Sequence, residues 1–478
     1  MTVCMQESLP FQRHYSQDVV ADFQGSRVSS DGGALLLRAV DQQTGLLDLA
    51  SGCFTDARDP DLMEHDLGAL VRQRVLGMCL GYEDLNDHDF LQGDSVLALA
   101  CGRRDVHGAE RRKSADVGKS LASSSTLNRL ELAVPVGDAT TPQVDRYHKI
   151  TFDPQAGQRL FTDFYMQAHT RPPKRIILDV DATDGIIHGK QEGRFFHGYY
   201  GSYCYLPLYI FCDDHLLWAE LRTSDQDGAT GCTEAIAQIV KQLRAQPGWQ
   251  KTQIIVRGDS GFCRDDLMTW CEANKVDYIL GLARNNRLTT TMSPFMDFAE
   301  DTYYHTQQPH TEFHQFSYKT RKTWSCERTV IGKVEVLPSP RPGDDRVKHN
   351  QRFIVTTLTD DDPETLYRTW YCQRGDMENR IKEQQLCLFA DRTSTATVWS
   401  NQIRLWFSFI AYCLMHALRR LALTGTALAK AQCSTIRNRL LKIGTIIRTT
   451  SRRIWIHFSG SHPAEKIFRH AAHALDGT

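Results

Sequence analysis

The chain has 478 residues, of which 41% are hydrophobic and 24% charged, and its formal net charge is −1. These values are typical of a soluble globular protein with more than one domain. No N-terminal segment combines basic residues with an apolar run, so we expect no signal peptide, and the most apolar stretch, residues 405–418, is too short for a membrane span. The 14 cysteines include no Cys-x-x-Cys pair, which argues against a zinc ribbon or a disulfide framework and favours a reducing, cytosolic compartment.

Charge is distributed unevenly along the chain. Residues 1–100 contain 16 acidic residues and 6 Lys or Arg, a net charge of −10, whereas residues 401–478 contain 2 acidic residues and 12 Lys or Arg, a net charge of +10. One interpretation is that two regions dock through opposite charge. We favour the other, a basic C-terminal surface that contacts phosphates, because the carboxylates described below also require a polyanionic substrate.

Residues 1–150 are predicted to be mainly helical, because segments 34–40 and 65–78 carry apolar residues at three- and four-residue spacing. A basic stretch, with Arg103-Arg104 and residues 111–113, leads into the Ser-rich segment 120–126. This stretch is either a DNA-contacting loop or a solvated linker.

The pattern changes after Pro172-Pro173, where strands alternate with helices. Residues 172–290 therefore predict the first part of a mixed α/β sheet that is covered on both faces. Alternating residues predict a β-rich insertion at 291–350. Residues 351–400 return to the core with a strand and a helix, and residues 401–478 predict a basic helical region whose helix at 406–418 is buried.

Carboxylates follow two of the predicted strands. Asp179 and Asp181 end the apolar run 176–181, and they point to the same side because side chains alternate along a strand. Asp259 ends the next such strand, before a Ser-Gly turn. A single Asp in this position is usually a turn or cap residue, but two of them at one sheet edge favour a binding site.

A third acid lies on a predicted helix. Tyr371, Arg374 and Glu378 are spaced i, i+3 and i+7, and so share one helical face. Alone, this stripe would equally suit a surface salt bridge. With the two Asp strands, it predicts a site where three carboxylates hold two Mg²⁺ ions for phosphoryl transfer, with Arg374 placed to neutralise phosphate charge.

These segments resemble the DDE transposases of bacterial insertion sequences. The branch with a Tyr-x2-Arg-x3-Glu-x6-Lys signature matches at Tyr371, Arg374 and Glu378, but its last position is Gln385 here. Asp181-Ala-Thr matches the first family aspartate, and Arg-Gly-Asp259-Ser-Gly matches the second.

The resemblance implies a ribonuclease-H-like core with a β-rich insertion between Asp259 and Glu378. It also implies a cytoplasmic, nucleoid-associated bacterial enzyme, without a membrane segment, that cleaves double-stranded DNA at terminal inverted repeats and joins it to target DNA, acting as a homodimer with Mg²⁺ or Mn²⁺. By this resemblance Asp181 would bridge two ions, and Asp259 and Glu378 would each hold one. Tyr371 and Arg374 would contact DNA, with Lys382 as a substitute for the missing Lys, and residues 1–150 would bind the DNA ends.

Two alternatives stay open: a structure-selective DNA nuclease without strand transfer, and an inactive end-binding repressor of transposition. Smaller candidates are His188 and Glu192, as metal or phosphate ligands or as parts of a polar turn, and Trp324, which would stack on a flipped base.

Overall fold

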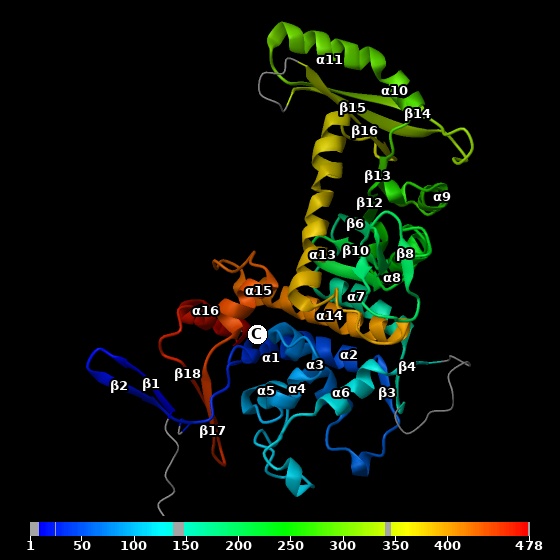
Figure 1. Cartoon of the computed structure of the whole chain (residues 1–478). Helices are drawn as coiled ribbons and strands as arrows, with labels where there is room; N and C mark the ends of the chain where they lie inside the picture. The colour runs from blue at the N-terminus through cyan, green and yellow to red at the C-terminus, as the bar shows by residue number, and fades with distance from the viewer. Residues whose placement is uncertain (1–8, 24, 137–147, 340–345, 477–478) are drawn as a thin grey trace, which may run out of the picture.

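The computed structural model describes residues 9–23, 25–136, 148–339 and 346–476. Figure 1 shows a helical body made from both ends of the chain, a central α/β region next to it, and a sheet-and-helix extension at the far end. The protein therefore has a mixed α/β architecture, as predicted.

One mixed sheet of eight strands runs through the central region and the extension. In sheet order the strands are β11 (His215–Glu220), β10 (Leu208–Cys212), β6 (Arg175–Ala182), β12 (Gln253–Gly258), β13 (Asp277–Leu282), β16 (Val347–Thr356), β15 (Arg328–Pro338) and β14 (His310–Tyr318). β6, β12 and β13 run parallel, whereas every other neighbouring pair in this sheet is antiparallel.

Both faces of this sheet are covered. Leu178 and Val180 of β6 belong to a core that includes α8 (Cys232–Ala245) and α9 (Asp265–Ala273). Ile177 points the other way, against a smaller cluster beneath the segment that leads to Glu378. Because side chains alternate along a strand, Asp179 and Asp181 lie on this second side.

The longest helix joins the central sheet to the helical body. α14 (Val398–Leu418) is buried at every position from Ile403 to Leu418, which confirms the predicted buried helix. It packs against the sheet through β11 and against α1 (Ala34–Thr44), α2 (Leu46–Ser51), α3 (Leu67–Leu80) and α6 (Ser124–Glu131) of the body. Among the described residues, no helix is both long enough and apolar enough to cross a membrane.

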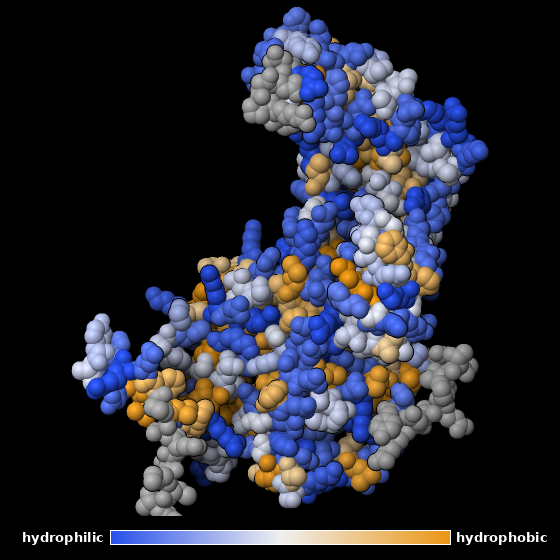
Figure 2. All heavy atoms as spheres, viewed as in Figure 1, coloured by the Kyte–Doolittle hydropathy of each residue, from blue (hydrophilic) through white to orange (hydrophobic). Residues whose placement is uncertain are grey.

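The segment predicted as a β-rich insertion contains long strands and, in addition, a helix that was not predicted. It begins with α11 (Ser293–Thr306), which starts with a proline in its first turn and follows the short helix α10 (Asn286–Thr291). Its strands β14 and β15 form no separate sheet, because β16 joins them to β13. Figure 2 shows that the visible face of this extension is mostly hydrophilic.

The C-terminal region also departs from the helical prediction. After α14 it contains a hairpin, β17 (Thr445–Thr449) and β18 (Ile454–Phe458), before the last helix α16 (Glu465–Asp476). Its strands contain the β-branched and aromatic residues that favour extended backbone. A second hairpin, β1 (Leu9–His14) with β2 (Gln17–Ala21), opens the described chain and protrudes from the body (Figure 1).

Candidate active site

Two aspartates meet at one edge of the sheet because their strands run parallel. Asp181 lies near the end of β6, and Asp259 directly follows β12. Gly258 is opposite Val180 in the register of these strands, so the next residues, Asp259 and Asp181, are neighbours. Asp259 accepts a hydrogen bond from the backbone N–H of Gly261 at 2.8 Å, which fixes its carboxylate at the turn after β12.

The third acid comes from an irregular helical segment. A π-helical turn, η5 (Leu366–Tyr371), and a 3-10 turn, η6 (Cys372–Arg374), precede α13 (Gly375–Leu388), which carries Glu378 in its first turn. The predicted regular helix is therefore interrupted immediately before the acid. The change in pitch still leaves Arg374 and Glu378 in contact, with Arg374 Nη2 2.9 Å from Glu378 Oε1.

Arg374 connects the helix to the sheet. Its Nη1 is 3.5 Å from Oδ2 of Asp181, while its Nη2 pairs with Glu378. Burial alone would lower the pKa of Arg374, but the charges of Asp181, Asp259 and Glu378 together raise it. Three carboxylates from three separate segments thus surround one guanidinium, and the cluster keeps an excess of negative charge.

Burial and the neighbouring charges both act on the Asp181 carboxyl. Burial raises its pKa to about 6, and the charges of Asp259 and Glu378 add to this rise. Arg374 and a hydrogen bond from the backbone N–H of Ala182, at 2.9 Å, oppose it. A carboxylate whose ionised form is destabilised in this way gains from an additional cation.

The donor set fits a hard divalent cation, although the side chains are arranged around Arg374. Across the ranges that the structure describes, no three His, Cys, Asp or Glu side chains are grouped to hold a metal ion. The Arg374 guanidinium instead contacts two of the three carboxylates. Carboxylate oxygens are the ligands that Mg²⁺ prefers, so the chemistry of these groups agrees with the predicted cofactor.

A buried ion pair beneath the site was missed by the sequence analysis. Arg257 donates to Asp179 through Nε, at 2.5 Å, and through Nη2, at 2.7 Å, and both side chains are buried. Its Nη1 also donates to the backbone carbonyl of Trp370, at 2.5 Å. Arg257 therefore ties β12 to β6 and both strands to η5. An arginine two residues before Asp259 in a buried strand was the available signal, since such a residue needs an acidic partner.

Gly281 was also missed, and its lack of a side chain lets the site close. A Cβ at this position of β13 would lie 2.6 Å from the Tyr371 hydroxyl and 2.9 Å from the backbone nitrogen of Ser260. The Tyr371 hydroxyl is therefore close to the turn that carries Asp259, whose charge raises the pKa of Tyr371 in addition to the larger effect of burial.

The two helix residues beyond Glu378 differ in their surroundings. Lys382 is exposed one turn later and forms no hydrogen bond or ion pair with the described residues. Gln385, in the place of the family lysine, donates from Nε2 to the backbone carbonyl of Asp184 at 3.3 Å. Gln385 thus attaches α13 to the turn that follows Asp181.

Two of the smaller candidates have structural roles. Glu192 accepts a hydrogen bond from the backbone N–H of Val398, at 3.1 Å, so its carboxylate caps the start of α14, which favours the structural interpretation. Trp324 is only 6% exposed, packs edge-to-face on Tyr318 and lies beneath the guanidinium of Arg328, so its ring is not free to stack on a base. His188 is exposed and has no hydrogen-bond partner among the described residues.

Comparison with known families agrees with the motif order. The family model described as "Transposase DDE domain group 1" matches residues 11–478. A comparison with curated proteins gives no significant match. The match covers the helical body, the whole sheet and all three acids, so the chain belongs to the DDE transposase family.

Proposed function

We propose that this protein cuts DNA at the terminal inverted repeats of an insertion sequence and joins the freed ends to target DNA. The observation that supports this most is the convergence of Asp181, Asp259 and Glu378 around Arg374 from three separate segments. We also propose that the five strands from β11 to β13 form a ribonuclease-H-like core, that the helical body binds the DNA ends, and that two copies act together.

The carboxylates and the arginine have complementary tasks in this proposal. Asp181, Asp259 and Glu378 would hold two Mg²⁺ ions, or Mn²⁺ in their place, which when bound activate the attacking oxygen and stabilise the leaving oxygen. Arg374 offers its guanidinium to the phosphate that is cut, and Tyr371 borders the same space. Lys382, exposed on α13, would contact the DNA backbone nearby.

The test is cleavage of a labelled duplex that carries the terminal repeats flanking the gene, with Mg²⁺, Mn²⁺ or EDTA. Asp181→Ala, Asp259→Ala and Glu378→Gln should each abolish cutting while duplex binding persists. Asp376→Asn is a matched control, because Asp376 is exposed on the same helix, two residues before Glu378, and its side chain forms no hydrogen bond or ion pair with the described residues. Full activity in the three variants would refute the assignment.

Two further readouts separate the alternatives. Mg²⁺ should raise the thermal unfolding temperature of the wild type and not of Glu378→Gln, which tests cation binding without relying on activity. Joining of cut ends to target DNA would exclude a nuclease that lacks strand transfer. Binding without cutting in any metal would instead favour the inactive end-binding protein.

A further inference from the structure

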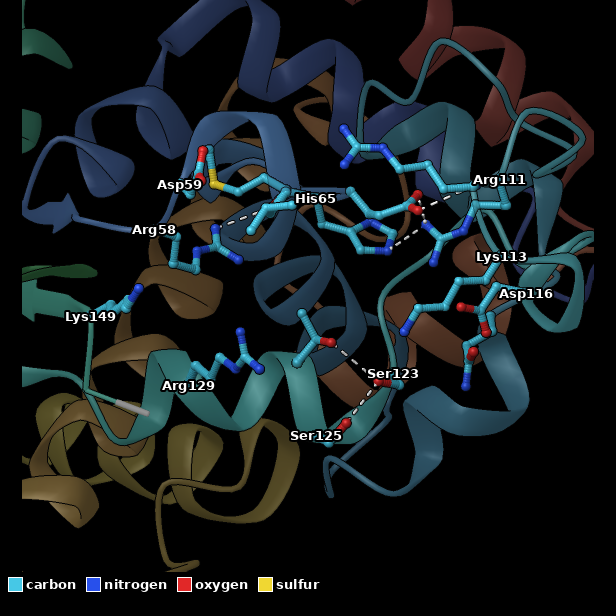
Figure 3. A pocket seen from close by; sticks show the side chains of 16 residues that line it. Arg58, Asp59, His65, Arg111, Lys113, Asp116, Ser123, Ser125, Arg129 and Lys149 are labelled. Carbon is cyan, nitrogen blue, oxygen red and sulfur yellow. Dashed lines mark hydrogen bonds and ion pairs between the residues drawn. The ribbon is translucent and has the colours of Figure 1, made fainter. Parts of the chain in front are cut away.

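A polar pocket of about 750 Å³ lies in the helical body, away from the carboxylates, and is formed by residues between 58 and 149 (Figure 3). Its walls come from the chain around η1 (Pro60–Leu62), the loop around η2 (Ser114–Asp116) and the start of α6. Six cationic side chains line it: Arg58, Arg111, Arg112, Lys113, Arg129 and Lys149. Three acidic side chains do so as well: Asp59, Glu64 and Asp116.

The acids are engaged within the protein. Asp59 accepts a hydrogen bond from the backbone N–H of Asp61 at 3.0 Å, and Glu64 pairs with Arg111 at 3.2 Å. Asp116 pairs with Lys119, which does not line the pocket, at 3.7 Å. Glu64 and Asp116 thus have basic partners, whereas Asp59 keeps its charge, and the six cations still outnumber the three acids.

Three of the cations lack such partners. Lys113, Arg129 and Lys149 form no side-chain hydrogen bond or ion pair with any residue in the described parts of the chain. Figure 3 shows Arg129 and Lys149 on one side of the pocket and Lys113 on the other, with their nitrogen atoms directed into it. Like charges that converge repel one another, and an anion between these three cations would offset that repulsion.

A fourth cation is held in place by a neutral histidine. Arg111 Nη1 is 2.8 Å from Nε2 of His65, and because arginine can only donate, this imidazole nitrogen must be an acceptor. Burial, together with the charges of Arg103 and Arg111, lowers the pKa of His65 to about 3. The charge on this wall therefore stays constant across the physiological pH range.

Hydroxyl groups complete the opposite wall. Ser123 Oγ lies 3.0 Å from Ser125 Oγ and 3.2 Å from Thr126 Oγ1 at the first turn of α6. Ser123 occupies the N-cap position but its side chain does not cap the helix, so its hydroxyl faces these neighbours instead. Hydroxyl groups beside arginines and lysines commonly contact DNA phosphates.

We propose that this pocket binds a backbone phosphate of duplex DNA and anchors the DNA away from the carboxylate site. The inference deepens the proposed function and rests on it, because an enzyme that cuts DNA must also hold the duplex beyond the cut. The basic stretch and the Ser-rich segment, which the sequence left as a DNA-contacting loop or a linker, form two walls of one pocket. Arg112 and Lys113 are exposed at the edge of the pocket. Positive charge therefore extends beyond the pocket, as contact with the extended phosphate backbone of DNA requires.

The test compares two full-length variants that each lose three positive charges. Lys113→Gln/Arg129→Gln/Lys149→Gln removes the cations without side-chain partners, so the folded contacts of the pocket remain. The control, Lys241→Gln/Lys251→Gln/Lys275→Gln, removes three exposed lysines from α8, η3 (Trp249–Lys251) and the turn after α9. Fluorescence anisotropy then measures binding to a terminal-repeat duplex and to an unrelated duplex between 50 and 200 mM salt, conditions over which phosphate contacts dominate affinity.

The pocket variant should bind both duplexes more weakly, and the slope of log K against log salt should fall by about 1, the value for one lost phosphate contact. A slope equal to that of the control would overturn the proposal. A second result would also overturn the proposal. In that result, inorganic phosphate or ATP raises the unfolding temperature of the wild type but not of the pocket variant, while the wild type and the pocket variant bind duplex equally. If DNA binding depends on the pocket but no metal-dependent cutting occurs, this inference stands and the proposed function is refuted. If metal-dependent cutting occurs but DNA binding does not depend on the pocket, the proposed function stands and this inference is refuted.

Discussion

Replacing Arg257 by methionine should destabilise the protein strongly, because it leaves the Asp179 carboxylate buried without its partner. The pair is bidentate, at 2.5 and 2.7 Å, and each side chain is only 6% exposed. Breaking such a buried pair from one side costs about 3–5 kcal/mol. Protonation of the stranded carboxylate relieves part of this cost, so the loss should be larger at pH 8 than at pH 5.

Urea unfolding followed by tryptophan fluorescence measures this loss against the wild type. Asp179→Leu/Arg257→Met removes both charges and should recover most of the stability, whereas Asp179→Leu alone strands the arginine. Activity should stay low in the double variant, because the bond from Arg257 to the Trp370 carbonyl, which holds η5, is also lost. A loss below about 1 kcal/mol for Arg257→Met, or no recovery in the double variant, would refute the reasoning.

Three further changes test the site. Gly281→Ala places a Cβ 2.6 Å from the Tyr371 hydroxyl, so cleavage should fall about tenfold or more, whereas Gly460→Ala, with open space around it, should leave cleavage unchanged. Asp181→Asn should stabilise the metal-free protein at pH 8 by up to about 3 kcal/mol, because the pKa of Asp181 is raised to about 6 from 3.8. That gain should nearly vanish by pH 3, below both pKa values, where the carboxyl is mostly protonated in both states, and unfolding in EDTA that shows the same gain at both pH values would contradict it. Gln385→Lys should strengthen salt-dependent DNA binding, measured against Gln385→Ala, and equal binding by the two would count against a phosphate near this turn of α13.

The parts of the site that local patterns determine could be predicted. An apolar run that ends in a carboxylate identifies a strand and its exposed end, and two such strands in a parallel sheet place Asp181 and Asp259 together. The continuous apolar stretch of α14 similarly predicts a buried helix. In these cases, neighbouring residues carry the information that determines the structure.

Features that depend on contacts between distant segments could not be predicted. The pairing of β15 with β16 and of β16 with β13 carries the extension into the main sheet, and no local pattern specifies which strands become neighbours. The burial of Trp324 arises from Tyr318 and Arg328 across a hairpin loop. The interruption before α13 similarly follows from tertiary contacts, since Arg257 fixes the Trp370 carbonyl at this position.

The charge balance of the site explains why an arginine belongs among its acids. Three carboxylates that face one another are unfavourable without a counter-charge, and the charges of Asp259 and Glu378 add to the larger effect of burial in raising the pKa of Asp181. Arg374 supplies part of the missing positive charge through Asp181 and Glu378. In the proposed reaction, the carboxylates bind cations and the Arg374 guanidinium binds a phosphate. Each side of the internal ion pair would therefore meet, in the bound complex, a partner with the same sign of charge as the one it has now. The same interactions that stabilise the cluster without substrate would then be exchanged, charge for charge, when DNA and cations are bound.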